Sequence, residues 1–275
     1  MAELFIKQAA EYAKTRPRYP KQLFEFIASE TPCHDVVWDV GTGSGQAAVS
    51  LSGIYKTVIA TDTSATQLDH APRLPNVHYR LTPPVIPPAD LPLHIAGEST
   101  VDLVTVGQAL HWFDLPAFYK QAQWVLKKPH GVIAAWCYCE PEIDPAVDSV
   151  LDSFYAADSA PYWDPLRKLV EDGYRGVDFP FEAVEGAGEG ETGPFRFTAE
   201  QAMDLEGFFT YVRSWSAYQT AKERGVELLG DAVVEKFRRA WCNDENGDGG
   251  GEEKVIKVVR FPVYLRIGKV GMVKM

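Results

Sequence analysis

VVWDVGTGSGQ, residues 36–46, joins a short apolar run to a turn with three glycines. The apolar residues at 36–38 and 40 predict a short strand that is buried on both faces. Glycines follow at 41, 43 and 45, and apolar residues at helical spacing begin after them. Glycine permits a positive φ and lets another molecule approach the backbone closely. A strand, a glycine turn and a helix in this order are typical of a nucleotide-type site, although a turn that only connects two elements remains the alternative.

Strands and helices alternate along the chain on both sides of this turn. Further strands are predicted at 55–62, 77–81, 101–107 and 131–139, with helical segments between them. This alternation predicts parallel βαβ units and an open α/β sheet. Ligands of such sheets bind beyond the carboxyl ends of the strands. Asp39, the glycine turn, Asp62 and Gly107-Gln108 all fall at predicted strand ends, so we expect them along one crevice.

The remaining segments are less regular. Residues 1–20 predict an amphipathic helix, and 226–241 predict a second helix. Residues 258–268 alternate like a strand, which Pro262 is expected to place at a sheet edge or a bulge. Residues 141–165 are rich in proline, aspartate and aromatic residues, and no element is predicted there.

Composition and charge exclude several classes of partner. The 275 residues carry a formal net charge of −11, and 46% of them are hydrophobic. An acidic chain argues against a nucleic-acid groove or an anionic membrane surface as the main partner. The sequence has no apolar run of transmembrane length and no apolar signal core at its start. We therefore expect a cytoplasmic protein with a small-molecule partner and no membrane or nucleic-acid partner.

The cysteines and the acidic loop near the end of the chain predict no metal site. Cys137 and Cys139 lie in a predicted strand as C-x-C, and no second pair stands at zinc spacing, so buried thiols are expected. The loop NDENGDGGGEE at 243–253 partly matches a calcium loop. Its twelfth position is Val255 where a bidentate glutamate is required, which favours a solvated loop.

An acid at the end of the second strand indicates an adenosine-type ligand. Asp62 stands 17 residues beyond Gly45, and a carboxylate there can accept both hydroxyls of a ribose. Asp39 precedes the glycine turn, where it would repel a pyrophosphate but suit an ammonium or a sulfonium group. The G-x-G-x-x-G spacing of a dinucleotide site is also missing. These features favour S-adenosylmethionine over NAD.

Several segments of the chain resemble those of a known family. DVGTGSGQ, VDLVTVGQALHWFD (101–114) and QWVLKKPHGVIAAWCY (123–138) look like the class I S-adenosylmethionine-dependent methyltransferases, specifically those with a methyltransferase type 11 domain. YAKTRPRYP (12–20) is typical of the small-molecule branch that includes trans-aconitate methyltransferase. The resemblance covers residues 1–140, is weak over 141–250, and returns in FPVYLRIGK.

The resemblance implies both the fold and the domain layout. The expected fold is a Rossmann-like doubly wound sheet of seven strands with the last one antiparallel, in three α/β/α layers with a helical lid. Residues 1–275 would form one methyltransferase domain with a cofactor-binding core at 36–140. Residues 1–30 and 141–250 would be cap and acceptor-site elements, and 254–268 the terminal strand.

The resemblance also implies a set of cofactor-binding residues. Ala89 stands where the family often has an acidic residue, so Asp90 or backbone amides would have to recognise adenine. Thr63 would stack beside the adenine, and Asp62 would hold the ribose hydroxyls. Gln108 would face the methionine end, and Arg16 would pair with the methionine carboxylate. The remaining members would lie along the ribose and the methionine part. The full set is Arg16, Asp39, Gly41, Thr42, Gly43, Gly45, Asp62, Thr63, Ala89, Asp90 and Gln108.

The methyl acceptor is left open by the sequence. A carboxylate acceptor needs no general base, whereas a hydroxyl or an amine usually does, and His111 is the candidate base. The aromatic residues and the arginine that could line an acceptor pocket are Trp112, Trp136, Tyr138, Arg213 and Trp215. An O-methyltransferase acting on a carboxylate is slightly preferred by analogy. An NAD-dependent oxidoreductase and a non-catalytic S-adenosylmethionine-binding protein are the alternatives.

Overall fold

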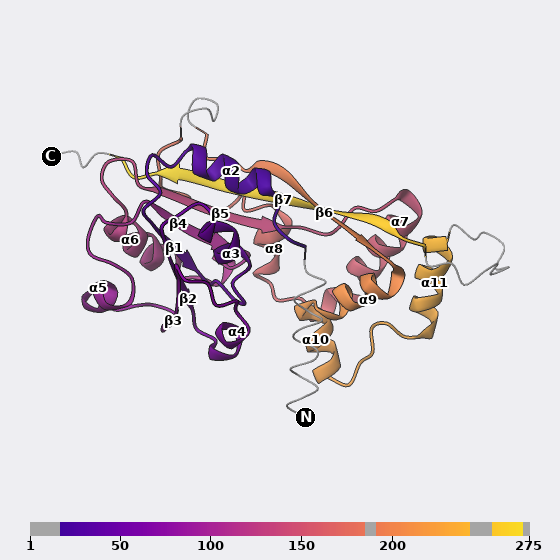
Figure 1. Cartoon of the computed structure of the whole chain (residues 1–275). Helices are drawn as coiled ribbons and strands as arrows, with labels where there is room; N and C mark the ends of the chain where they lie inside the picture. The colour runs from indigo at the N-terminus through magenta and orange to yellow at the C-terminus, as the bar shows by residue number, and fades with distance from the viewer. Residues whose placement is uncertain (1–16, 185–190, 243–254, 272–275) are drawn as a thin grey trace. The chain divides into compact units, whose positions relative to one another are not determined.

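The structure is a computed structural model that describes residues 17–184, 191–242 and 255–271 (Figure 1). Its sheet has seven strands in the order β3-β2-β1-β4-β5-β7-β6. Neighbours among the first five strands run parallel, and β7 runs antiparallel to β5. The strands are β1 (Val36–Val40), β2 (Thr57–Asp62), β3 (Val77–Leu81), β4 (Leu103–Gly107), β5 (Val132–Tyr138), β6 (Phe195–Met203) and β7 (Lys257–Lys269).

Helices alternate with the parallel strands, as the sequence predicts. The α-helices are α2 (Lys21–Ser29), α3 (Gln46–Ser52), α4 (Ala65–Asp69), α5 (Leu91–His94), α6 (Leu115–Val125), α7 (Pro145–Ser153), α8 (Arg167–Glu171), α9 (Leu205–Arg213), α10 (Ser216–Glu223) and α11 (Asp231–Cys242). The short helices are η1 (Pro88–Asp90), η2 (Leu110–Trp112), the π-helical η3 (Phe154–Ser159) and η4 (Ala160–Tyr162). Together with the sheet order, they confirm the Rossmann-like α/β fold.

Contacts divide the chain into two compact units. One is built from Glu140–Arg167 and Ala199–Phe261, and it contains α7 and α9–α11. The other is built from Tyr19–Cys139, Lys168–Thr198 and the segment from Pro262 onward. We call them the helical unit and the sheet unit, and each is described by itself.

The core of the sheet unit explains why its strands are so apolar. β5 is buried along its whole length, and β1, β2 and β4 have buried centres. Trp38, Val104 and Ile133 join the apolar side of α6 in one cluster, where the Trp38 and Phe118 rings lie 6.3 Å apart. α3 contacts β1, β2 and β3 as well as α2. Strands enclosed in this way need apolar residues at every position rather than alternation.

The starts of α4 and α6 are where the sequence predicts them, because both predicted capping residues make their hydrogen bonds. The side chain of Ser64 accepts a hydrogen bond from the Gln67 N–H at the start of α4. Asp114 accepts one from the Ala117 N–H at the start of α6. Each cap satisfies a backbone donor that has no partner within its helix. The predicted buried thiols are also confirmed, since Cys137 and Cys139 are buried and free of disulfides.

Three local predictions were wrong or incomplete. β7 lies between β5 and β6, so Pro262 is not on an edge strand. α11 begins at Asp231, five residues after the predicted start at 226. Residues 226–230 are not helical, and Gly230 directly precedes the helix. β6 was not predicted, since its sequence FRFTAEQAM mixes polar residues with few buried ones.

None of the described helices has the length and apolar character needed to span a membrane. The described residues also hold no group of three or more histidine, cysteine or acidic side chains that could bind a metal ion. The acidic loop considered above as a calcium site, like the N-terminal helix predicted at 1–20, falls largely outside the described residues.

Candidate functional site

The carboxyl ends of β1, β2 and β4 meet at one edge of the sheet unit. β1 is paired with β2 on one side and with β4 on the other. Asp39 is near the end of β1, Asp62 ends β2, and Gln108 follows β4. The structure therefore brings together the strand-end residues that the sequence predicts to share a crevice, which is where open α/β sheets bind ligands.

The glycine turn after β1 has a left-handed backbone at each glycine. Gly41, Gly43 and Gly45 have φ of +65°, +55° and +82°, values that other residues adopt at a cost. A Cβ at Gly41 would come within 2.7 Å of the Ala109 Cβ. A Cβ at Gly43 would meet only the Gln67 Oε1, at 3.9 Å. Gly41 is therefore required by packing, whereas Gly43 borders open space where a ligand could approach the backbone.

Asp62 is held against this turn by backbone groups. Its Oδ2 accepts a hydrogen bond from the Gly43 N–H at 2.8 Å. Its Oδ1 accepts one from the Ser64 N–H, also at 2.8 Å. A carboxylate offers about four lone-pair sites, so each oxygen retains acceptor capacity. Two neighbouring hydroxyls are the donors that such a fixed carboxylate suits, and a ribose therefore fits the residues present.

Asp39 lies beneath the turn and is 1% exposed. Its Oδ2 accepts from the Thr42 hydroxyl at 2.5 Å, and its Oδ1 accepts from the Thr105 hydroxyl at 2.8 Å. Burial raises the pKa of Asp39 to about 6, the two hydroxyls oppose the rise, and the charge of Asp62 adds to it. Asp39 thus anchors Thr42 of the turn to β4, and at neutral pH it still carries negative charge below the turn.

The raised pKa of Asp39 predicts a pH-dependent contribution to stability. The folded protein holds this proton more tightly than the unfolded chain, whose ordinary value is 3.8. The stabilising contribution is present at low pH and is lost as pH rises through the folded value. Between about pH 5 and pH 7.5, this group alone should lower the unfolding free energy by about 1 kcal/mol.

Asp39→Asn removes this titration while keeping the side-chain shape. When urea unfolding is measured at both pH values, the unfolding free energy of the wild type should fall by about 1 kcal/mol more than that of the variant between about pH 5 and pH 7.5. Comparing the two proteins cancels the contribution of the other acidic groups. Parallel pH dependence of wild type and variant would contradict the assignment.

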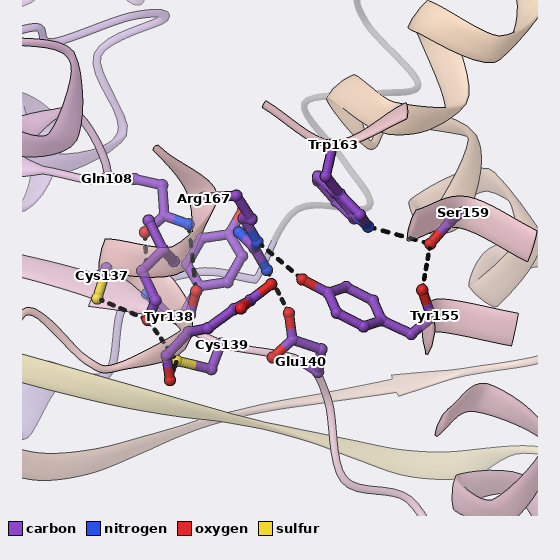
Figure 2. A network of polar contacts seen from close by, with 11 residues as sticks. Gln108, Cys137, Tyr138, Cys139, Glu140, Tyr155, Ser159, Trp163 and Arg167 are labelled. Atoms are coloured by element: carbon purple, nitrogen blue, oxygen red, sulfur yellow. Dashed lines mark hydrogen bonds and ion pairs between the residues drawn. The ribbon is translucent and has the colours of Figure 1, made fainter. Parts of the chain in front are cut away.

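Gln108 links the ends of β4 and β5. Its side-chain Nε2 donates to the Tyr138 carbonyl at 3.2 Å, and its Oε1 accepts from the Tyr138 N–H at 2.9 Å (Figure 2). Its backbone φ is +59°, which is rare for a residue other than glycine. Such strain is found most often at functional sites. Gln108 therefore directly follows β4, as the sequence predicts, but its side-chain amide is bonded to the backbone of Tyr138 at the end of β5.

The residues predicted to face adenine lie on two segments. Thr63 is exposed directly after β2, and Ala89 and Asp90 lie on η1, where Ala89 is exposed. The proline-rich loop that precedes η1 is tied to α6, because the Gln121 Nε2 donates to the Ile86 carbonyl at 2.5 Å. Arg16, predicted to pair with the methionine carboxylate, lies outside the described residues.

The acceptor-site candidates of the sheet unit differ in exposure. Trp112 is 55% exposed on η2, beside His111, whose ring lies 4.7 Å away. Trp136 is fully buried, with its ring 5.3 Å from that of Tyr19, and Tyr138 is also buried. Trp136 therefore acts as core in this structure, while Trp112 is available to a ligand.

His111 follows β4 next to the glycine turn. Loop residues on both sides of it pack on that turn, since Ala109 and Phe113 are the neighbours of Gly41. The Nδ1 of His111 lies 2.9 Å from the Tyr174 hydroxyl. Tyr174 was not among the site residues predicted from the sequence. A visible signal was the motif DGYRG at 172–176, because glycines close to an aromatic residue mark a turn with unusual backbone angles.

In the helical unit, Arg213 lies at the end of α9 and is exposed, with its guanidinium 5.9 Å from the Phe209 ring. Trp215 is buried and belongs to a cluster of three rings with Tyr155 and Trp163, at centroid distances of 5.3–5.9 Å. The Trp163 Nε1 also donates to the Ser159 hydroxyl at 3.0 Å. Tyr155 and Ser159 lie in the π-helical turn η3, a rare element that is frequent at functional sites.

A second arginine, which the sequence analysis did not single out, lies beside this cluster. The guanidinium of Arg167 is 4.7 Å from the Trp163 ring. Its Nη2 pairs with the Glu140 Oε1 at 2.5 Å, and its Nε donates to the Tyr155 hydroxyl at 3.3 Å (Figure 2). Arg167 is thus held by an aromatic ring, a carboxylate and a phenol, whereas Arg213 is largely in solvent.

Comparisons with known proteins agree with this geometry. Residues 38–135 match the family model described as a methyltransferase domain. A Dictyostelium discoideum protein classed with the methyltransferases is 30% identical over 262 residues, covering 94% of this chain and 91% of that protein. CRG1 of Saccharomyces cerevisiae, described as a probable S-adenosylmethionine-dependent methyltransferase, is 26% identical and covers 77% and 79%.

A solved structure extends the likeness to three dimensions. It is described as a type II methyltransferase of Anaeromyxobacter dehalogenans and superposes with a TM-score of 0.77 at 31% identity. The match covers 94% of this chain and 99% of that chain. At that coverage, the likeness extends to most of the described residues between 141 and 242, where the sequence alone showed little pattern.

Proposed function

Because this chain belongs to the class I S-adenosylmethionine-dependent methyltransferase family, we propose that it transfers a methyl group to an oxygen atom of a small molecule, preferably a carboxylate. The cofactor is S-adenosylmethionine, and its product is S-adenosylhomocysteine. The family membership replaces the NAD-dependent oxidoreductase that the sequence left as an alternative. Cytoplasmic location and the likeness to the trans-aconitate branch stay predictions.

The proposed donor site consists of the glycine turn and Asp62. The observation that carries it is the hydrogen bond from the Gly43 N–H to the Asp62 Oδ2, beside the open space at Gly43. The fixed carboxylate would accept the ribose hydroxyls, and the bare backbone would lie along the ribose and methionine part. Asp39, below Thr42, would attract the methionine ammonium through its field rather than by direct contact.

The protein's main contribution to the reaction would be orientation. A bound sulfonium supplies a methyl group that is already activated for in-line displacement. Residues that hold two reactants in line can supply roughly 7–11 kcal/mol, as intramolecular reactions show. The turn and Asp62 would fix one reactant, while acceptor-binding groups fix the other and keep water away from the reacting oxygen.

A carboxylate acceptor agrees with the groups near the turn. A carboxylate is ionised at neutral pH, so its transfer step requires no base. His111, the candidate base, is bonded through Nδ1 to the Tyr174 hydroxyl. Within the helical unit, the guanidinium groups of Arg167 and Arg213 are of the kind that pairs with carboxylates.

The proposal is tested by incubation with S-adenosylmethionine carrying a labelled methyl group. trans-Aconitate is the first acceptor, followed by simple aliphatic dicarboxylates, matched alcohols and amines, and a cell extract. We expect base-labile labelled methyl esters to form, and to form with carboxylates only. Label appearing on amines alone would overturn the carboxylate preference, and label appearing only on macromolecules would overturn the small-molecule acceptor.

A further inference from the structure

His111 and Tyr174 form a pair within the sheet unit. The His111 Nδ1 and the Tyr174 hydroxyl oxygen are 2.9 Å apart. Tyr174 is completely buried, and its side chain comes from the segment that follows α8. A histidine nitrogen can donate or accept, so the direction of this bond decides which ring nitrogen carries the proton.

The surroundings of the phenol oxygen make Tyr174 the donor. Burial raises the pKa of Tyr174 well above its ordinary value, so the phenol keeps its proton. The nearby backbone N–H groups of Leu110 and His111 oppose the rise. The buried phenol proton needs an acceptor, and among the described residues the His111 Nδ1 lies at hydrogen-bond distance from it.

The opposite arrangement would be costly. If the His111 Nδ1 carried the proton, it would donate to the phenol oxygen, and the buried phenol proton would be left without an acceptor among the described residues. Leaving a buried donor unsatisfied disfavours the tautomer that does so by roughly 5- to 150-fold.

The backbone at Tyr174 is strained in order to place this phenol. Tyr174 has φ of +58° and follows Gly173 at +59°. A bulky residue with a left-handed backbone is a genuine outlier, and such strain persists only when the surroundings enforce it. Arg266, which is buried on β7, provides that support, since its Nη1 donates to the carbonyls of Tyr174 and Val177 at 2.9 and 3.2 Å.

We propose that Tyr174 is a positioning residue that keeps the His111 proton on Nε2, so that His111 acts on the acceptor as a hydrogen-bond donor and not as a general base. What this inference implies about the methyl acceptor rests on the proposed function, and the inference makes that function more specific. A donor orients and binds an oxygen that is already anionic, whereas it cannot remove a proton from a hydroxyl or an amine. The site is therefore built for carboxylate oxygens or other acceptors ionised at neutral pH.

The tautomer is measured directly by nitrogen NMR of the ligand-free protein labelled with ¹⁵N-histidine. We expect the neutral His111 ring to show a protonated Nε2 and an unprotonated Nδ1. Tyr174→Phe should turn this single form into a mixture of tautomers. Tyr119→Phe is the matched control, because it removes another buried tyrosine hydroxyl, which donates to the Asp178 carbonyl at 2.8 Å, and it should leave the His111 signals unchanged. A protonated Nδ1 in the wild type would overturn the inference.

The chemical role is measured by comparing two His111 variants with trans-aconitate and labelled S-adenosylmethionine. Gln can accept from Tyr174 and donate outward, but it is not a base. His111→Gln should therefore retain kcat within roughly 3-fold, while His111→Ala loses roughly 10- to 100-fold. Equal losses of roughly 10²- to 10⁴-fold in both variants would show a general base and overturn the inference. No transfer by the wild type to any carboxylate would instead be a failure of the proposed function, and the NMR result distinguishes the two.

Discussion

Gly43→Val is expected to abolish S-adenosylmethionine binding, with a loss of affinity greater than about 100-fold, while the protein stays folded. The branched side chain would occupy the open space beside the turn. Among the described residues other than its chain neighbours, the atom nearest to a Cβ added at Gly43 is the Gln67 Oε1, at 3.9 Å. It would also strain a backbone with φ of +55°. Calorimetric titration with the cofactor measures the affinity, and thermal unfolding measures the fold.

Gly225→Val is the control for the backbone strain. Gly225 has φ of +76°, and no atom lies within 4 Å of its added Cβ, so the substitution carries a similar strain at a site with open space around it. The control should lose stability but bind the cofactor normally. If Gly43→Val binds the cofactor as tightly as the control does, the ligand lies elsewhere and the turn only connects β1 with α3.

Asp62→Ala is expected to weaken cofactor binding 10-fold or more, about 1.4 kcal/mol. The variant loses the acceptor proposed for the ribose hydroxyls and also releases the Gly43 N–H from its partner. Both effects act on the same ligand. The change should appear in the dissociation constant for S-adenosylhomocysteine as well, because that molecule contains the same ribose.

Asp204→Ala is the matched control for Asp62. Asp204 also accepts a hydrogen bond from a backbone N–H, that of Gly207 at 2.8 Å, but it caps α9 in the helical unit. Losing such a cap costs about 1 kcal/mol of stability. The control should therefore unfold more easily and bind the cofactor normally. Unchanged affinity in Asp62→Ala would remove Asp62 from the donor site.

The parallel part of the fold could be predicted from the sequence because its signals are local. Residues 36–40 and 131–139 are apolar runs enclosed on both faces, and glycine, Ser64 and Asp114 mark the elements that follow them. β6 could not be predicted in this way. Its residues are mostly exposed or half-buried, and it is a strand because it pairs at the edge of the sheet rather than because of its own pattern.

In the candidate site too, some residues could be predicted from local sequence signals, whereas others meet only in the folded protein. The glycine turn and Asp62 are adjacent in space because consecutive parallel strands place their carboxyl ends together, so their partnership could be inferred from spacing. Tyr174 and His111 are 63 residues apart and meet only through the turn after α8. Arg167 similarly meets Glu140 through the folding of the helical unit. Contacts of this kind depend on tertiary structure that a periodic pattern does not encode.

The structure also shows that the predicted acceptor-site residues differ in their exposure to solvent. Trp136 was a candidate for the acceptor pocket, but its side chain is fully buried among Tyr19 and Phe24. Arg213 is exposed, so Arg167 is the better-anchored cation of the helical unit. Residue type alone could not separate these cases, because the same aromatic or basic side chain serves a core, a surface or a pocket depending on what surrounds it.

We expect the turn at Gly43 and the carboxylate of Asp62 together to hold the adenosine and methionine parts of the cofactor. A crystal structure of the complex with S-adenosylhomocysteine tests it most directly. The account predicts both ribose hydroxyls within hydrogen-bond distance of the Asp62 oxygens, and the methionine part along the backbone of residues 41–45. A ligand bound at another edge of the sheet, or a ribose out of reach of Asp62, would contradict it.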